Sequence, residues 1–221
     1  GCCHDYGAQK DLLKNGLEAR ANVVVDHMHT ADKTTRPAFP AHTNADYAKG
    51  YDLVIHDECA ADISDPEMVK NVLAPHLAGL PGVNLHCAMH SYRAATIDDW
   101  REFLGVTSRK HDHQSKYPVR PVVKDHLSTA HLPAEWKRRD EWYNFRNLQE
   151  DNQVLILLDE STYKGGKNGE KHPIAWCKDV AKGRMFYTAG GHTKESFSEP
   201  DFMKHLQGGV LWTLRKTEFP K

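Results

Sequence analysis

Short apolar runs alternate along this chain with segments in which apolar residues recur at helical spacing. Runs of strand length occupy residues 23–25, 51–55, 82–85, 154–158 and 184–189. Such runs, bounded by polar or turn residues, are typical of strands buried on both faces. The alternation of these runs with amphipathic segments predicts an α/β domain, in which helices cover a sheet.

Four segments combine the helical period with the signals of helix ends. The first carries Leu12, Leu13 and Leu17 on one face, and the second has Pro66 in its first turn, where proline is favoured. The predicted helices are residues 6–21, a helix that starts at Ser64 or Asp65, a helix that is capped by Thr96 and runs to Gly105, and residues 200–214.

The remaining segments are less regular. Residues 164–170 predict a turn, and we expect residues 173–176 and 184–187 to form antiparallel strands at one edge of the sheet. Trp176 is expected in the core, and Gly190 and Gly191 are expected to allow a sharp turn. Residues 119–123 are a further expected strand. Residues 30–46 are expected to form an irregular loop, and residues 127–149 have no clear period.

Polar side chains follow directly where several predicted strands end. They are Asp26 and His27, then His56, Asp57 and Glu58, then His86, Cys87 and His90, and finally His192 after two glycines. The opening residues, including His4, Asp5 and Tyr6, are interpreted as the exit loop of a strand that lies outside the given sequence. Because open parallel sheets bind ligands at the carboxyl ends of their strands, these side chains predict a functional site.

Composition narrows the function classes. The 221 residues suit a single domain, and 29 basic against 30 acidic residues argue against a nucleic-acid or membrane-surface role that depends on bulk charge. No apolar run is long enough to span a bilayer, so we expect a soluble chain, cytoplasmic or exported in a bacterium. The five cysteines are odd in number and irregularly spaced, which indicates neither a disulfide framework nor a zinc motif.

Several segments resemble a known family. They are HDY near the start, LHCAMH, AHLPAEWKRRDEWYNF and HPIAWCKDVAKGRMFYTAGGHTKESFSEPDFMKHLQGGVLW. Their joint order resembles the trehalose-utilisation, ThuA-like domain over nearly the whole chain, as one domain of residues 1–221 whose first strand should precede Gly1. The resemblance implies the fold of class I glutamine amidotransferases, which is flavodoxin-like and doubly wound, with a mainly parallel sheet and helices on both faces. It also implies disaccharide catabolism, in particular of trehalose and its 3-keto derivative.

The amidotransferase resemblance does not extend to a complete glutaminase triad. In that superfamily a nucleophilic cysteine occupies the turn between strand and helix, and a histidine and a glutamate complete the triad. Here His86 corresponds to the nucleophile position, and Cys87 is one residue further on. His192 resembles the triad histidine, but Glu195 follows it by three residues where the pattern has two. We therefore do not expect glutaminase activity.

The histidines and one carboxylate suit proton transfer on a sugar. With 15 histidines, the chain is rich in the side chain that exchanges protons near neutrality. We predict His86, His192 and Glu141 as acid and base groups. The predicted substrate-binding residues are His4, Asp5, Tyr6, His56, His90, Trp142 and Tyr143. The last two lie in DEWYNF and are equally well explained as anchors that pack a long loop on the sheet.

Two alternatives stay open at this level. His4, His86 and His192 with a carboxylate would also accept Zn²⁺ or Mn²⁺, although no compact spacing in the sequence requires a metal. A non-catalytic sugar-binding or regulatory module on an amidotransferase-like scaffold is the alternative to an enzyme. In either case the expected partner is a small carbohydrate, and the sequence leaves a homo-oligomer open.

Overall fold

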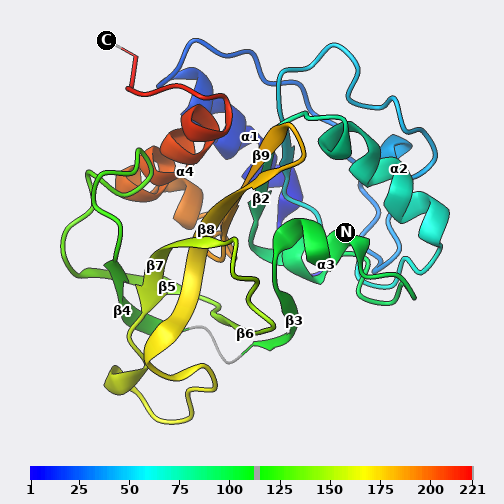
Figure 1. Cartoon of the computed structure of the whole chain (residues 1–221). Coiled ribbons are helices and arrows are strands. Elements are labelled where there is room, and N and C mark those ends of the chain that lie inside the picture. Colours follow the sequence, from blue (N-terminus) through cyan, green and yellow to red (C-terminus); the bar gives the residue numbers. More distant parts are fainter. Residues whose placement is uncertain (112–114, 221) are drawn as a thin grey trace.

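The computed structural model describes residues 1–111 and 115–220. Its main sheet has seven strands, in the order β1-β2-β9-β8-β7-β4-β5 (Figure 1). They are β1 (Val54–His56), β2 (Gly82–Leu85), β4 (Ser115–Pro121), β5 (Trp136–Asp140), β7 (Gln153–Leu158), β8 (His172–Val180) and β9 (Gly183–Thr188). Two further strands, β3 (Thr107–His111) and β6 (Tyr143–Arg146), pair with each other in a small antiparallel sheet.

The described sheet is mixed, which corrects the expectation of a mainly parallel one. Strands β1, β2 and β9 pair in parallel, whereas β9, β8, β7, β4 and β5 follow one another antiparallel. The predicted hairpin forms between β8 and β9, but it lies inside the sheet and not at its edge. Its two-residue connection requires antiparallel pairing. Nothing in that connection determines which strands lie on the outer sides of the hairpin.

The apolar run at residues 23–25 does not form a strand. Val24 is 85% exposed. Glu18 accepts a hydrogen bond from the Val25 amide at 2.9 Å, and Lys14 donates to the Val25 carbonyl. Side chains of the preceding helix therefore occupy the backbone groups that a neighbouring strand would bind.

Residues 127–149 contain β5 and β6, neither of which was predicted. In β5 the side chains alternate between buried and exposed, but Arg138 and Asp140 are on the buried face together with Trp136. A strand that buries an ion pair has no apolar alternation for a sequence pattern to detect. Strand β4 was expected at residues 119–123 and instead begins at Ser115 and ends at Pro121.

The four predicted helices are present. They are α1 (Tyr6–Glu18), α2 (Pro66–Leu77), α3 (Asp99–Leu104) and α4 (Pro200–Thr213), and the shorter 3-10 turns are η1 (Pro40–His42), η2 (His86–His90), η3 (Glu160–Thr162), η4 (Gly169–Lys171) and η5 (Ser196–Ser198). Asp65 caps α2 through the Glu67 amide, as one of the two predicted caps. The prediction for α3 was wrong at its start, because its cap position is Asp98 and not Thr96.

Helices α4 and α3 lie on opposite sides of the sheet at β9. On one face Phe186 of β9 packs against His205 of α4, and α1 lies beside α4 (Figure 1). On the other face Tyr187 packs against Trp176 of β8, whose indole donates to the Leu104 carbonyl at the end of α3 at 2.8 Å. Because neighbouring residues of a strand point to opposite faces, Phe186 and Tyr187 assign α4 and α3 to opposite sides. Trp176 is fully buried, so its predicted core position is confirmed.

The burial of His205 makes the free energy of unfolding depend on pH. Burial lowers its pKa to about 3, against an ordinary value near 6.5, so the folded chain keeps the ring neutral while the unfolded chain protonates it. Below pH 6.5 the unfolded state binds more protons, and the free energy of unfolding therefore falls as the pH drops toward 3.

We expect His205→Gln to reduce this slope between pH 6 and 4 by up to about 1.4 kcal/mol per pH unit. Glutamine retains an N–H group for the Ser128 carbonyl, to which His205 Nδ1 donates at 2.8 Å. Urea denaturation at several pH values measures the effect, and the exposed His27→Ala is the control. Parallel curves for wild type and His205→Gln would contradict the assignment.

Candidate functional site

His86 lies where β2 ends, and its surroundings determine its tautomer. Its backbone adopts φ 41°, in the left-handed region that is uncommon outside glycine. The Ala189 carbonyl at the end of β9 lies 2.6 Å from His86 Nδ1, and a carbonyl can only accept. Nδ1 therefore carries the proton, so the neutral ring has its lone pair on Nε2. Tyr187 donates to the His86 carbonyl at 3.0 Å and holds the backbone of the turn.

The predicted acid and base groups meet at His86 Nε2. His192 Nδ1 lies 3.3 Å from this nitrogen. Glu141 Oε2 lies 3.3 Å from His192 Nδ1 and 3.6 Å from His86 Nε2. Burial raises the pKa of the Glu141 carboxyl, but the hydrogen bond with His192 and the nearby His86 ring lower it by more, so the net pKa lies below its ordinary value. Glu141 is therefore a carboxylate at neutral pH, and its other oxygen, Oε1, lies 3.3 Å from a third imidazole, that of His111.

His4 joins this group from the other side. Its Nδ1 donates to the His192 carbonyl at 3.1 Å, and its ring lies edge-on to those of His86 and His192. Burial and these two neighbouring rings lower the pKa of His4 to about 3. Its Nε2 is buried and has no hydrogen-bond partner among the described residues. We call His4, His86, His192 and Glu141 the histidine cluster; one ring nitrogen from each histidine lies within 4.8 Å of the others.

The loop that carries His192 is held by Asp140. Its carboxylate accepts from the Gly191 amide at 2.9 Å and from the His192 amide at 3.1 Å. Gly191 has φ 118°, which confirms the sharp turn predicted there. Arg138 lies 3.2 Å from Asp140, and both side chains are almost completely buried. Sequence reasoning missed Asp140 and Arg138, and their separation by two residues on one face of a strand was the signal that could have found them.

The rings of Tyr143 and His90 pack beside His86 in the protein interior. The Tyr143 hydroxyl lies 3.1 Å from His86 Nε2, and His90 stacks on the Tyr143 ring at 4.2 Å. Burial lowers the pKa of His90 to about 3. Tyr143 and Trp142 are 1% and 3% exposed, so neither presents a free ring face to a sugar. Their surroundings match the packing alternative.

A cavity of about 770 Å³ opens beside the cluster, and His4, His192 and residues of the 29–33 segment are among its lining residues. His86 and Glu141 are not among them, although both contact His192. Pockets of this size are common for small-molecule ligands. Two members of the cluster, His4 and His192, therefore line the cavity.

Two further predicted substrate-binding residues, Asp5 and Tyr6, also line the cavity, whereas His56 lies elsewhere. Asp5 is exposed and caps α1 through the Ala8 amide. Tyr6 packs against a group of cysteines. His56 belongs to a second buried network, in which Nδ1 lies 3.0 Å from Glu58 and Nε2 lies 2.9 Å from His76 Nε2.

The cysteines also differ from the expectation. Cys2 and its neighbour Cys3 form a disulfide, although the sequence indicated no disulfide framework. Cys87 is buried and packs against Cys59 and Ala61 rather than facing His192. Glu195 is exposed. The residues that resemble a glutaminase triad are therefore not arranged as one.

Comparisons with known proteins agree with this fold. The family model described as "ThuA: Trehalose utilisation" matches residues 4–213. A ThuA-like protein from Parabacteroides merdae is 18% identical with TM-score 0.75, covering 96% of this chain and 86% of that one. One from Bacteroides uniformis is 21% identical with TM-score 0.66, covering 78% and 73%. PurLQS from Thermotoga maritima is 10% identical with TM-score 0.57, covering 91% and 92%.

No curated protein matches the chain. Among the described residues, no helix has both the length and the apolar composition that a bilayer crossing requires.

Proposed function

Because the chain belongs to the ThuA, trehalose-utilisation family, we propose that it is an enzyme that processes a disaccharide or a 3-keto-glycoside at the histidine cluster. The observation that carries the proposal is the convergence of His86 Nε2, His192 Nδ1 and Glu141 Oε2, whose separations are 3.3, 3.3 and 3.6 Å. Two imidazoles and a carboxylate at these distances can bind, donate and accept protons at a single point.

The same separations suit a divalent metal. Ligands about 2.0–2.2 Å from a tetrahedral Zn²⁺ lie roughly 3.3–3.5 Å from one another. His86 meets a further requirement, because metal-binding histidines usually donate their other ring N–H to a carbonyl or carboxylate, as His86 does to Ala189. Three protein ligands would leave a position for substrate, and His4, whose buried Nε2 has no partner among the described residues, lies beside them. The nitrogen-rich set favours Zn²⁺ over Mn²⁺.

When bound, such an ion supplies Lewis-acid polarisation of a sugar oxygen. The protein's own groups have separate roles. In the cluster without an ion, Glu141 holds His192 by its Nδ1, in the way that a carboxylate orients a catalytic imidazole. Tyr143 then donates to His86 Nε2 from the buried side. The cavity admits the sugar beside His4 and His192, so these are the cluster members that a substrate reaches first.

Elemental analysis and turnover test the proposal together. We expect about one zinc ion for each chain, turnover of a 3-keto-disaccharide, and loss of at least about 100-fold in turnover after chelation, with recovery when Zn²⁺ is restored. Calorimetric binding of the same sugar is measured in parallel. Binding without turnover, both with and without added metal, would instead support the non-catalytic sugar-binding module.

A further inference from the structure

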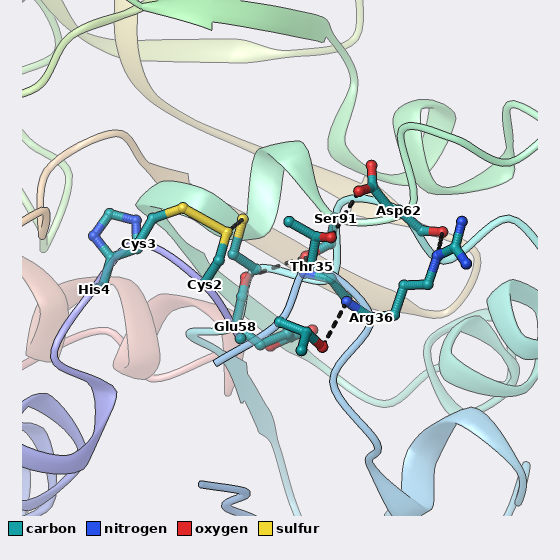
Figure 2. Close-up of a disulfide and its surroundings, with 12 residues drawn as sticks. Cys2, Cys3, His4, Thr35, Arg36, Glu58, Asp62 and Ser91 are labelled. Atoms are coloured by element: carbon teal, nitrogen blue, oxygen red, sulfur yellow. Dashed lines mark hydrogen bonds between the residues drawn. A yellow bond between two sulfur atoms is a disulfide. The ribbon is translucent and has the colours of Figure 1, made fainter. Parts of the chain in front are cut away.

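Four of the five cysteines lie together beside the histidine cluster. Cys2 and Cys3 form a disulfide, and Cys59 Sγ lies 3.9 Å from Cys2 Sγ. Because a disulfide sulfur has no proton, the Cys59 thiol is the donor in this contact. Cys87 packs against Cys59 in the same apolar group. Figure 2 shows the disulfide between the His4 ring on one side and Glu58 and Ser91 on the other.

The fold holds Cys59 in this position. It follows β1, Cys87 follows β2, and these parallel strands are neighbours, so both thiols emerge at one edge of the sheet. Ser91 accepts from the Ala60 amide at 3.0 Å and donates to the Glu58 carbonyl at 3.1 Å. These bonds fix the backbone on both sides of Cys59, which lies within the protein and faces the disulfide.

The surroundings of Cys59 favour its thiolate. A hydrogen bond from the Cys87 thiol lowers the pKa of Cys59, burial opposes this effect, and the charge of Arg93 lowers the pKa further, so the net pKa is below its ordinary value. The thiolate is the form that attacks a disulfide sulfur.

Cys3 connects the disulfide to the cluster. It has φ 80°, a left-handed conformation that side-chain-bearing residues rarely adopt, and it immediately precedes His4. Cys3 is exposed and lines the cavity. Release of Cys3 from the disulfide would free its backbone to leave the left-handed region, and the His4 backbone would move with it.

We propose that Cys2, Cys3 and Cys59 form a thiol–disulfide exchange site that sets the position of His4. Cys59 gives its proton to solvent, and its thiolate attacks Cys2 Sγ. The Cys2–Cys59 bond forms as the Cys2–Cys3 bond breaks, and Cys3 leaves as a thiolate that takes up a proton in the cavity. The step exchanges one disulfide for another and requires no external oxidant. The exchange stands independently of the proposed function, on which only its effect on catalysis rests.

Disulfide mapping tests the exchange. The whole chain is equilibrated in glutathione buffer, alkylated with N-ethylmaleimide, digested and analysed by mass spectrometry. We expect both Cys2–Cys3 and Cys2–Cys59 linkages in the wild type. In Cys3→Ser, the ratio of Cys2–Cys59 to unlinked Cys59 should be at least about tenfold higher than in the wild type. Cys177→Ser is the control and should match the wild type, since Cys177 contacts His126 and Gln153 elsewhere.

The exposed Cys3 makes Cys3→Ser the variant least prone to misfolding. Free Cys2 and Cys59 thiols in oxidised Cys3→Ser, or glutathione adducts alone, would overturn the exchange. If the reduced thiols instead bind zinc tightly, the cysteines form a metal site, and the proposed exchange is also overturned.

The effect on His4 has its own measurement. Ring ¹H–¹⁵N spectra are compared between Cys59→Ser, which retains Cys2–Cys3, and Cys3→Ser, with the His4 signal assigned by His4→Ala. We expect the His4 ring signals to differ between the two variants while those of the remote His205 coincide. Unchanged His4 signals would overturn the link to the cluster. Neither readout requires metal or turnover, so failure of the proposed function would leave both results interpretable.

Discussion

His86→Asn is expected to lower turnover of the sugar substrate by about 10²–10⁴-fold, the range typical for loss of an acid–base group. Asparagine tolerates the left-handed conformation at this position, and its amide nitrogen can still donate to the Ala189 carbonyl. The variant therefore removes mainly Nε2, around which His192 and Glu141 gather. We also expect it to bind less than a tenth of the wild-type zinc, because Nε2 is the ligand atom in the proposed zinc site.

Steady-state kinetics and elemental analysis measure these effects, and far-UV circular dichroism confirms folding. His27→Ala is the matched control, since this histidine is exposed and contacts Lys10 at the surface. A His86→Asn variant with wild-type turnover would exclude Nε2 from the chemistry. Wild-type zinc content with lost turnover would restrict His86 to proton transfer.

Asp140→Ala is expected to destabilise the folded chain by about 3–5 kcal/mol, because it removes the more deeply buried of the two carboxylates beside the Arg138 guanidinium. The Asp140 side chain has no solvent exposure, and its carboxylate also accepts from the Gly191 and His192 amides and from the Ser196 hydroxyl. Urea denaturation measures the loss. Asp179→Ala removes an exposed ion pair with Arg184 and serves as the control.

The size of the loss in stability shows whether Arg138 depends on Asp140 or is compensated by other groups. A loss of less than about 1 kcal/mol would mean that water or Glu199, which lies 3.3 Å from Arg138, compensates the guanidinium. If Asp140→Ala is folded at low temperature, we expect His192 to lose its contacts with His86 and Glu141 before the chain unfolds. Turnover should then fall at temperatures where the chain is still folded.

Local sequence patterns were sufficient for the parts of the site that follow strong strands. The apolar run at residues 82–85 ends at His86, and the run at residues 184–189 leads through two glycines to His192. Each was predicted from its own neighbours in sequence. Glu141 was named only from the aromatic motif around it, because β5 and β6 were not recognised. The ion pair that holds the site was missed for the same reason.

The sequence alone determined the four helices, the strands at the apolar runs 82–85, 154–158 and 184–189, and that histidines stand at the ends of several strands. Burial of apolar side chains and the signals at helix ends are local properties, so they can be read along the chain. Only the tertiary structure decided that β9 lies beside β2, which brings Ala189 and His192 to His86. It also decided that Glu141 reaches both rings and that Cys59 lies against a disulfide. Strand neighbours are selected by backbone pairing and burial summed over the whole sheet, and no local pattern contains that sum.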